Sequence, residues 1–223
     1  MKHSIIDLLI RPGAFFQNAM NDKEESLRFP ALVVLAVGIA SAMYGYLIGG
    51  LTGQLLGGIL PGMGAIIALS TVIGALIGTF IFWLIYAGVF YAFSILFKGE
   101  GTFKRTLECV GYGYLPQFFG TLITFVIALY YIPRIHVPQL SAAAAQNPDL
   151  ITEAIKALMN DPAMMELSQI AMIITIVFLL WSANIWIFSM QDARKLSPRD
   201  AALCVGIPVV LYILYMVYSM TVI

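Results

Sequence analysis

Residues 29–97 decide the fold and read FPALVVLAVGIASAMYGYLIGGLTGQLLGGILPGMGAIIALSTVIGALIGTFIFWLIYAGVFYAFSILF. This stretch contains no Asp, Glu, Lys, Arg or His. One membrane-spanning helix needs about 20 apolar residues, so the stretch must cross a bilayer more than once. Its segment Gly49–Gly64 holds seven glycines and Pro61. We expect the chain to turn there, because such a composition disfavours a continuous helix.

We therefore predict a first span over residues 29–50 and a second over residues 65–97. The second span is too long for a bilayer: at 1.5 Å per residue it reaches about 50 Å, against a hydrocarbon core of roughly 30 Å. It must tilt, project beyond the bilayer or begin in a re-entrant loop, and the sequence leaves these three alternatives open.

Three further apolar segments predict spans over residues 115–131, 170–190 and 201–222. The composition agrees with a lipid environment, because the chain is 61% hydrophobic and only 11% charged, whereas soluble domains carry roughly 25% charged residues. The predicted fold is an all-α membrane protein, a bundle of about five transmembrane helices.

Basic residues gather on one side of this topology. Ten of the 12 lie there: Lys2, Arg11, Lys23, Arg28, Lys98, Lys104, Arg105, Arg194, Lys195 and Arg199. By the positive-inside rule, the N-terminus is expected in the cytoplasm and the C-terminus on the extracytoplasmic side. Both flanks of the uncharged stretch are then cytoplasmic, which requires an even number of crossings between them.

Two segments are predicted to lie outside the membrane. Residues 1–28 have apolar residues surrounded by charges, which indicates a cytoplasmic interfacial amphipathic segment or, alternatively, a partner-binding helix. The extracytoplasmic loop 132–165 should contain an amphipathic helix that starts at Pro148 after an Asn147 cap. Asp161 is a second predicted cap, for a helix that begins at Pro162 and leads into the fourth span.

Several function classes lack support in the sequence. Net charge is zero, so no basic footprint indicates a nucleic-acid partner. Cys109 and Cys204 have no metal-binding spacing and are predicted to be small buried residues. There is no GxxxxGK[ST], HExxH, GxSxG or glycine-rich dinucleotide motif. We therefore predict no enzyme activity, no cofactor, and no catalytic, cofactor-binding or metal-binding residues.

Glycines spaced four residues apart indicate a helix-packing face, because they let helix backbones approach closely. These candidates are Gly45, Gly49, Gly53, Gly57, Gly74 and Gly78. The pattern is compatible with packing inside the chain or with a homo-oligomer, and both alternatives stay open.

Three polar residues near or within spans are candidates for a functional role. Glu108 lies one turn before the third span, where a carboxylate is costly and so suggests function. The alternative is an interfacial Glu108 paired with Lys104 or Arg105 along the helix. Asn184 and Gln117 are candidates for hydrogen bonds between helices.

Residues 102–120 read TFKRTLECVGYGYLPQFFG. The features that carry a family resemblance are Gly111, Tyr112, Leu115 and Pro116 in this segment, Pro12, Phe15 and Phe16 near the start, and the turn 196–201 before the last span. On these features the chain resembles the Yip family, the Ypt/Rab-interacting membrane proteins and their prokaryotic relatives.

The resemblance implies a five-span fold and no established activity. Eukaryotic members of the family are linked to Rab GTPases and vesicle traffic, and they carry a longer cytoplasmic region with a DLYGP-like motif. Residues 1–28 lack that motif, so the resemblance implies a prokaryotic-type member.

Our interpretation is a multi-pass protein of the cell membrane that serves as a non-catalytic scaffold or membrane-organising, trafficking-related protein. Its partners are then the lipid bilayer, a cytoplasmic protein and a second copy of the chain. A small transporter or channel with a site at the glycine-rich break, residues 49–64, is the alternative. A membrane-embedded lipid-modifying enzyme is the third hypothesis.

Overall fold

The computed structural model describes residues 5–20 and 25–222, and this part of the chain is helical with no strand. Its long helices are α3 (Arg28–Leu56), α4 (Gly64–Leu96), α6 (Leu115–Tyr131), α8 (Pro162–Arg194) and α9 (Pro198–Val222). Its short helices are α1 (Ile5–Ile10), α2 (Pro12–Met20), α5 (Phe103–Tyr112) and α7 (Pro148–Met159), with 3-10 turns η1 (Ile132–Arg134) and η2 (Ala142–Gln146).

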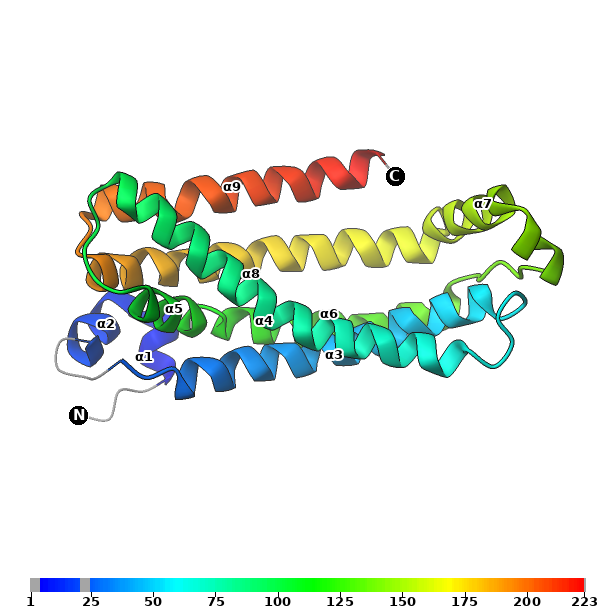
Figure 1. Ribbon diagram of the computed structural model, residues 1–223, viewed down its shortest axis with the longest axis horizontal. Coiled ribbons are helices and arrows are strands. Elements are labelled where there is room, and N and C mark those ends of the chain that lie inside the picture. Colours follow the sequence, from blue (N-terminus) through cyan, green and yellow to red (C-terminus); the bar gives the residue numbers. More distant parts are fainter. Residues whose placement is uncertain (1–4, 21–24, 223) are drawn as a thin grey trace.

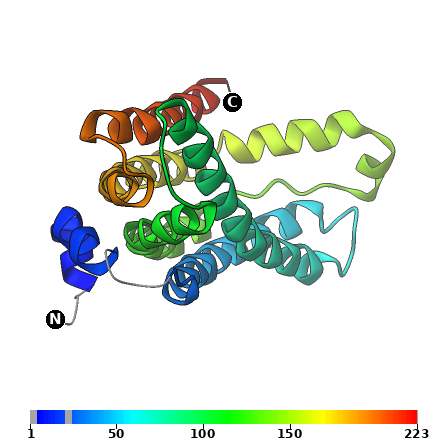
Figure 2. The same cartoon turned by 60° about the vertical axis from the view of Figure 1, so that its left-hand side comes forward.

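Within the described residues, five helices are long and apolar enough to cross a membrane, which confirms the predicted fold class. Helices α3, α6, α8 and α9 lie side by side along the long axis of the molecule, α4 crosses them obliquely, and the short helices gather at the two ends (Figure 1). The turned view shows α1 and α2 beside the bundle rather than within it (Figure 2).

The glycine-rich segment differs from the expectation. Helix α3 continues through Gly49, Gly50 and Gly53 to Leu56, and the turn is confined to residues 57–63. The turn lies within the predicted segment Gly49–Gly64, but the first long helix ends at Leu56 and not at residue 50, so that predicted bound is wrong. Glycines in a helix cost only about 1 kcal/mol each, and the close packing that they permit against α4 offsets that cost.

The overlong second span resolves into a single helix that lies obliquely. Helix α4 begins at Gly64 and runs without interruption to Leu96. Figure 1 shows it crossing diagonally over its neighbours, so the tilt is the alternative that the structure supports. In the described chain, residues 57–63 form a short turn and no re-entrant helix precedes α4.

Three predicted glycines lie where α3 meets α4. A Cβ at Gly45 would lie 3.2 Å from the Thr71 carbonyl oxygen, and one at Gly53 would lie 2.9 Å from the Gly64 Cα. A Cβ at Gly49 would meet the α4 backbone at 2.9 Å. The Thr71 hydroxyl also donates to the Gly45 carbonyl at 2.8 Å. These glycines therefore allow two backbones to touch, in the way that small residues do in membranes.

The other glycine candidates lie elsewhere. Gly57 meets only the backbone of the preceding α3 turn. Around Gly74 and Gly78, no described atom of another element lies within 4 Å of a Cβ placed there. The contacts within the chain therefore give these two glycines of α4 no packing role, and their part in a homo-oligomer stays a prediction.

Both predicted helix caps are present. The Asn147 side chain accepts from the Asp149 amide at 3.1 Å, and Pro148 begins α7. The Asp161 carboxylate accepts from the amides of Ala163 and Met164 at 2.9 and 3.1 Å. These oxygens pair with amides that the first helical turn leaves without partners.

The helices enclose two apolar cores, one toward each end. The core at the α5 end is built around Val34, Phe90, Trp186 and Met190. The opposite core contains Leu51, Leu55, Leu140, Leu158 and Leu167 and buries one side of α7. The amphipathic loop helix therefore rests on the bundle, while Leu150, Ile155 and Met159 stay exposed.

Candidate functional site at the basic end of the bundle

Helix α5 lies across the end of the bundle where the basic residues gather. Thr102 caps it, because its hydroxyl accepts from the Arg105 amide at 3.1 Å. The residues from Thr106 to Gly111 are buried, whereas Phe103 and Lys104 are exposed. The helix packs against α3, α4 and α8 and so presents its N-terminal turn to the surroundings.

Two indoles hold the C-terminal half of α5 in place. Trp83 of α4 donates from Nε1 to the Leu107 carbonyl at 2.9 Å. Trp186 of α8 donates to the Val110 carbonyl at 2.8 Å. Both tryptophans are almost fully buried, so each indole N–H has the partner that a buried donor requires. Neither contact was predicted from the sequence.

Close packing explains the glycines of the motif GYGYLP, residues 111–116. A Cβ at Gly111 would lie 2.5 Å from the Pro30 Cβ, and one at Gly113 would overlap the Trp186 indole. Only glycine lets α5 approach α3 and α8 this closely. Pro116 is buried in the first turn of α6, where a missing amide hydrogen is tolerated.

Tyr112 joins α5 to the N-terminal helices. Its ring contacts the rings of Phe15, Phe16 and Phe29, with centroids 5.6, 6.0 and 5.5 Å away. Burial raises the pKa of its hydroxyl to about 12, so Tyr112 is neutral at physiological pH. The residue therefore acts through packing.

Glu108 is buried and paired. Its carboxylate accepts from the Arg105 guanidinium at 2.8 Å, which is the interfacial pairing that the sequence offered as one alternative. Burial raises the pKa of Glu108, while Arg105 and a hydrogen bond from the Ser26 backbone lower it. The carboxylate thus ties α5 to the segment before α3.

Arg194 was counted only as a loop cation, yet it is 2% exposed. Its Nε donates to the Ser94 hydroxyl at 2.9 Å and its Nη2 to the Gly99 carbonyl at 2.8 Å, and its Nη1 donates to the Gly101 carbonyl. Its guanidinium also lies 4.3 Å from the centroid of the Tyr91 ring. Arg194 therefore fastens the end of α8 to the α4–α5 loop.

A helical spacing of four residues was the signal for this burial. Arg194 follows Trp186 and Met190 on one face of α8, and both of those residues are fully buried. The positive-inside rule counts every cation near a span in the same way, so it does not distinguish a buried arginine from an exposed one.

The N-terminal segment forms two short helices that dock on the bundle. Leu8 and Phe16 are fully buried against α5 and α8, and the Trp181 indole donates to the Leu9 carbonyl at 3.1 Å. Ile5, Ile6 and Ile10 remain exposed. The single amphipathic helix expected for residues 1–28 is thus two helices, α1 and α2, separated at Arg11, and residues 1–4 and 21–24 lie outside the described chain.

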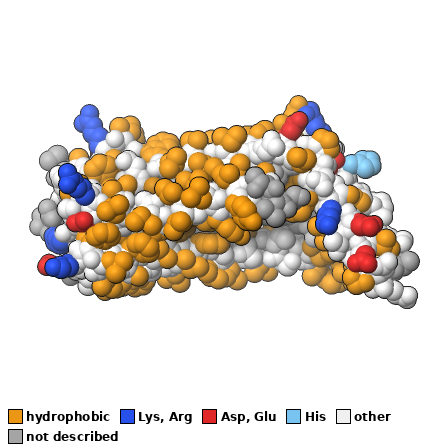
Figure 3. Space-filling model, turned by 90° about the horizontal axis from the view of Figure 1, so that it is seen from above, with side chains coloured by type: hydrophobic (Ala, Val, Ile, Leu, Met, Phe, Trp, Pro, Cys, Tyr) orange, Lys and Arg blue, Asp and Glu red, His pale blue; other side chains and the backbone are white. Residues whose placement is uncertain are grey.

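Around α5, the exposed cations form a basic rim. It consists of Arg11, Arg28, Lys98, Lys104, Lys195 and Arg199. On the face seen in Figure 3, Lys and Arg side chains gather at this end, and acidic side chains are more frequent at the other. Acidic Asp7 and Glu100 are also exposed at this end, and Glu25, Asp192 and Asp200 are half-buried there, so the surface carries charges of both signs.

The other polar candidates lie apart from α5. Gln117 donates from Nε2 to the Ser182 hydroxyl at 3.3 Å, which links α6 to α8 and faces the bundle interior. Asn184 is exposed on the outside of α8. Cys109 and Cys204 are both buried free thiols, as predicted, and burial raises the pKa of the Cys109 thiol well above its ordinary range. Described His, Cys, Asp and Glu side chains form no cluster suited to a metal ion.

Comparison with known proteins gives one family and one relative. The family model of the Yip1 domain matches residues 6–220. An uncharacterized protein of Methanocaldococcus jannaschii is 37% identical over 127 residues, which cover 57% of this chain and 89% of that protein. No solved structure matches. The matched region includes α5, the first four predicted spans and all but the last two residues of the fifth, as the resemblance at residues 102–120 implied.

Proposed function

Because this chain belongs to the Yip1 domain family, we propose that it is a non-catalytic scaffold that presents the α5 surface to a cytoplasmic protein. It is a multi-pass membrane protein, and we place it in the cell membrane with the α5 end in the cytoplasm. The observation that carries the proposal is the attachment of α5 by two indole hydrogen bonds, which fixes the position of exposed Lys104 among the cations of the basic rim.

Rigid attachment favours a recognition role. Two indole hydrogen bonds, the Arg194 contacts and the hydrogen bond from the Ser26 backbone to Glu108 hold α5, its flanking loop and the segment before α3 in one arrangement. A surface that is ordered before binding loses less conformational entropy when a partner docks. Exposed Lys104 and Arg199 then give the surface a charge that steers an acidic partner toward it.

The transporter alternative has two supporting observations and one against it. A cleft of about 520 Å³ lies beside Gly50, Gly53 and Gly64 in the glycine-rich segment. Gln117 lines a cavity within the bundle, as a polar ligand site would require. Helices α3 and α4 are unbroken, however, so the described chain lacks the discontinuous helices that motivated a site at residues 49–64. We therefore favour the scaffold and treat the cavity as a separate site below.

The experiment is affinity purification of the full chain in mild detergent, with mass spectrometry of the proteins that co-purify. Lys104→Glu/Arg199→Glu reverses two exposed charges of the basic rim. The matched control is Lys156→Glu/Glu153→Lys on α7, at the opposite end of the bundle. We expect a partner that is retained by the wild type and the α7 variant and lost from the rim variant.

Two results would overturn the proposal. One is a partner that the rim variant retains as well as the wild type does. The other is co-purification of a small polar ligand alone, with no protein in stoichiometric amount, which is the outcome that a transporter predicts.

A further inference from the structure

A polar cavity lies inside the bundle, between the two apolar cores. Its volume is about 230 Å³, and α3, α4, α6, α8 and α9 all contribute to its walls. Thr79 lies 17 residues from the basic end of α4, which is about 26 Å along the helix. The cavity therefore reaches the depth of the hydrocarbon core, where an unpaired polar group is expensive.

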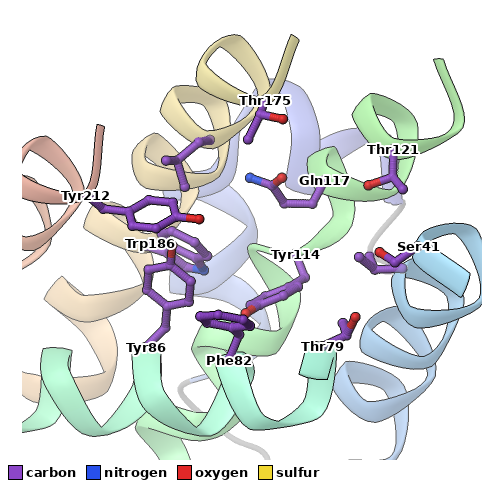
Figure 4. Close-up of a pocket in the computed structure, with 12 residues that line it drawn as sticks. Ser41, Thr79, Phe82, Tyr86, Tyr114, Gln117, Thr121, Thr175, Trp186 and Tyr212 are labelled. Atoms are coloured by element: carbon purple, nitrogen blue, oxygen red, sulfur yellow. The ribbon is translucent and has the colours of Figure 1, made fainter. Parts of the chain in front are cut away.

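The lining offers both donors and acceptors of hydrogen bonds. The phenols of Tyr86 and Tyr212 lie at one side, and the Gln117 amide and the Tyr212 hydroxyl point toward each other across the space (Figure 4). The Thr79 and Thr175 hydroxyls donate to carbonyls of their own helices at 2.8 Å. Their oxygens can still accept, because a hydroxyl has two lone pairs.

One buried group has no partner. Tyr114 is 5% exposed, lines the cavity and points its ring toward Phe82 and Tyr86 (Figure 4). Its hydroxyl makes no hydrogen bond to any described residue. An unsatisfied buried hydroxyl costs about 1–3 kcal/mol, and such groups in native proteins call for an explanation. A ligand with an acceptor oxygen would satisfy it.

The charge of the lining restricts the ligand. Among the described residues, no Asp, Glu, Lys, Arg or His lines the cavity, so neither a phosphate nor a metal ion would find a counter-charge. Contacts between aromatic rings also reduce the ring surface that is open to a cation. Tyr86 lies against Trp186 with centroids 5.2 Å apart and an interplanar angle of 32°. This contact covers part of the two ring faces that a quaternary ammonium group would need.

The size and the opening of the cavity indicate a small group that arrives from the bilayer. Drug-sized ligands occupy roughly 300–1,000 Å³, so this volume suits a smaller fragment. Phe82 lines the cavity and is nevertheless 51% exposed on the outside of α4. The cavity therefore reaches the lipid-facing surface at Phe82, where acyl chains lie.

We propose that this cavity binds a small uncharged polyol group, as in the glycerol moiety of a diacylglycerol. A free polyol can donate from its hydroxyls to Thr79, Thr175 and the Gln117 amide oxygen. A diacylglycerol has one free hydroxyl, which donates to one of these acceptors, and its ester oxygens accept from the tyrosine hydroxyls. In the lipid-borne case the acyl chains leave past Phe82 into the bilayer. The inference is independent of the protein partner proposed for the basic rim.

Native mass spectrometry of the full chain in detergent tests the site. The probes are dioleoylglycerol, free glycerol, dioleoyl phosphatidic acid and dioleoyl phosphatidylcholine, three of which share the same chains. We expect the wild type to retain one dioleoylglycerol and to bind the two phospholipids at least tenfold more weakly. Retention of free glycerol without dioleoylglycerol would support a polyol site and show that its ligand is a water-soluble polyol and not a lipid.

Variants separate binding from stability. Tyr114→Phe removes one hydroxyl at nearly constant volume, and loss of one hydrogen bond should weaken dioleoylglycerol binding about fivefold. Its thermal midpoint should stay the same or rise, because the unpaired group is gone. Gln117→Leu is the second test, with the same expected loss. Tyr215→Phe, on the exposed side of α9, is the matched control and should bind like the wild type.

Three outcomes would overturn the proposal. The wild type retains neither dioleoylglycerol nor glycerol, or it prefers phosphatidic acid or phosphatidylcholine. In the third, Tyr114→Phe and Gln117→Leu bind the polyol as tightly as the wild type and Tyr215→Phe do.

Discussion

Replacing Arg194 by methionine tests whether its buried side chain stabilises the basic end of the bundle. Methionine keeps most of the apolar volume and removes the donors to Ser94, Gly99 and Gly101. Each buried acceptor left unpaired costs about 1–3 kcal/mol, and loss of the cation above Tyr91 adds about 0.5–1 kcal/mol. The two carbonyl contacts are only partly buried. We therefore expect each of the three acceptors to contribute near the lower end of that range of about 1–3 kcal/mol, so the free energy of unfolding should fall by about 3 kcal/mol.

The assay is unfolding in dodecyl maltoside micelles with increasing dodecyl sulfate, followed by tryptophan fluorescence. Arg199→Met is the matched control: Arg199 is an exposed cation five residues further on, and its loss should change the free energy by less than about 0.5 kcal/mol. Ser94→Ala alone and combined with Arg194→Met completes a double-mutant cycle, in which we expect coupling of about 1 kcal/mol. An Arg194→Met protein as stable as Arg199→Met would refute the reasoning.

Three further predictions concern the same fold. Gly111→Ala places a Cβ 2.5 Å from the Pro30 Cβ, so we expect a loss of about 1–3 kcal/mol, measured in the same titration, and an unchanged protein would contradict the close packing. Burial raises the pKa of Glu108, so the folded state binds the proton more tightly than the unfolded chain and stability falls as pH rises from 4.5 through the raised pKa. Glu108→Gln should remove that slope from midpoints measured between pH 4 and pH 8, and a slope that persists would assign it to another group. Gly74→Leu leaves the monomer stable because open space surrounds this glycine. If the glycine face joins two copies, light scattering should then show a dimer for the wild type and a monomer for this variant, and identical masses would exclude that face.

The sequence was sufficient for the elements that a bilayer constrains. The uncharged stretch 29–97 required two crossings, and the Asn147 and Asp161 caps marked helix starts that the structure confirms. These features are local: each cap acts within three residues, and a span is recognised by its own hydropathy. The end of α3 was misplaced because glycine propensity is a weak signal beside packing against α4.

The candidate site was predictable in part. Glu108 and its pairing with Arg105 followed from a helical spacing of three, and Gly111 and Tyr112 followed from the family resemblance. Trp83 and Arg194 were missed, because their partners lie 24 and 93–100 residues away in the chain. A helical spacing of four residues can mark Arg194 as buried, but it does not identify partners that lie so far away in the sequence.

By itself, the sequence determined that lipid surrounds most of this chain, how many times it crosses and which connecting segments share a side. Backbone groups in hydrocarbon must pair within their own helix, so each span can be predicted from its own segment of the sequence. Only the tertiary structure decided which helix faces enclose the polar cavity and which cation is buried. In a soluble helix an apolar stripe identifies the inner face, but here lipid and interior are both apolar, and the hydropathy of α3, α4 and α9 barely differs between their two sides.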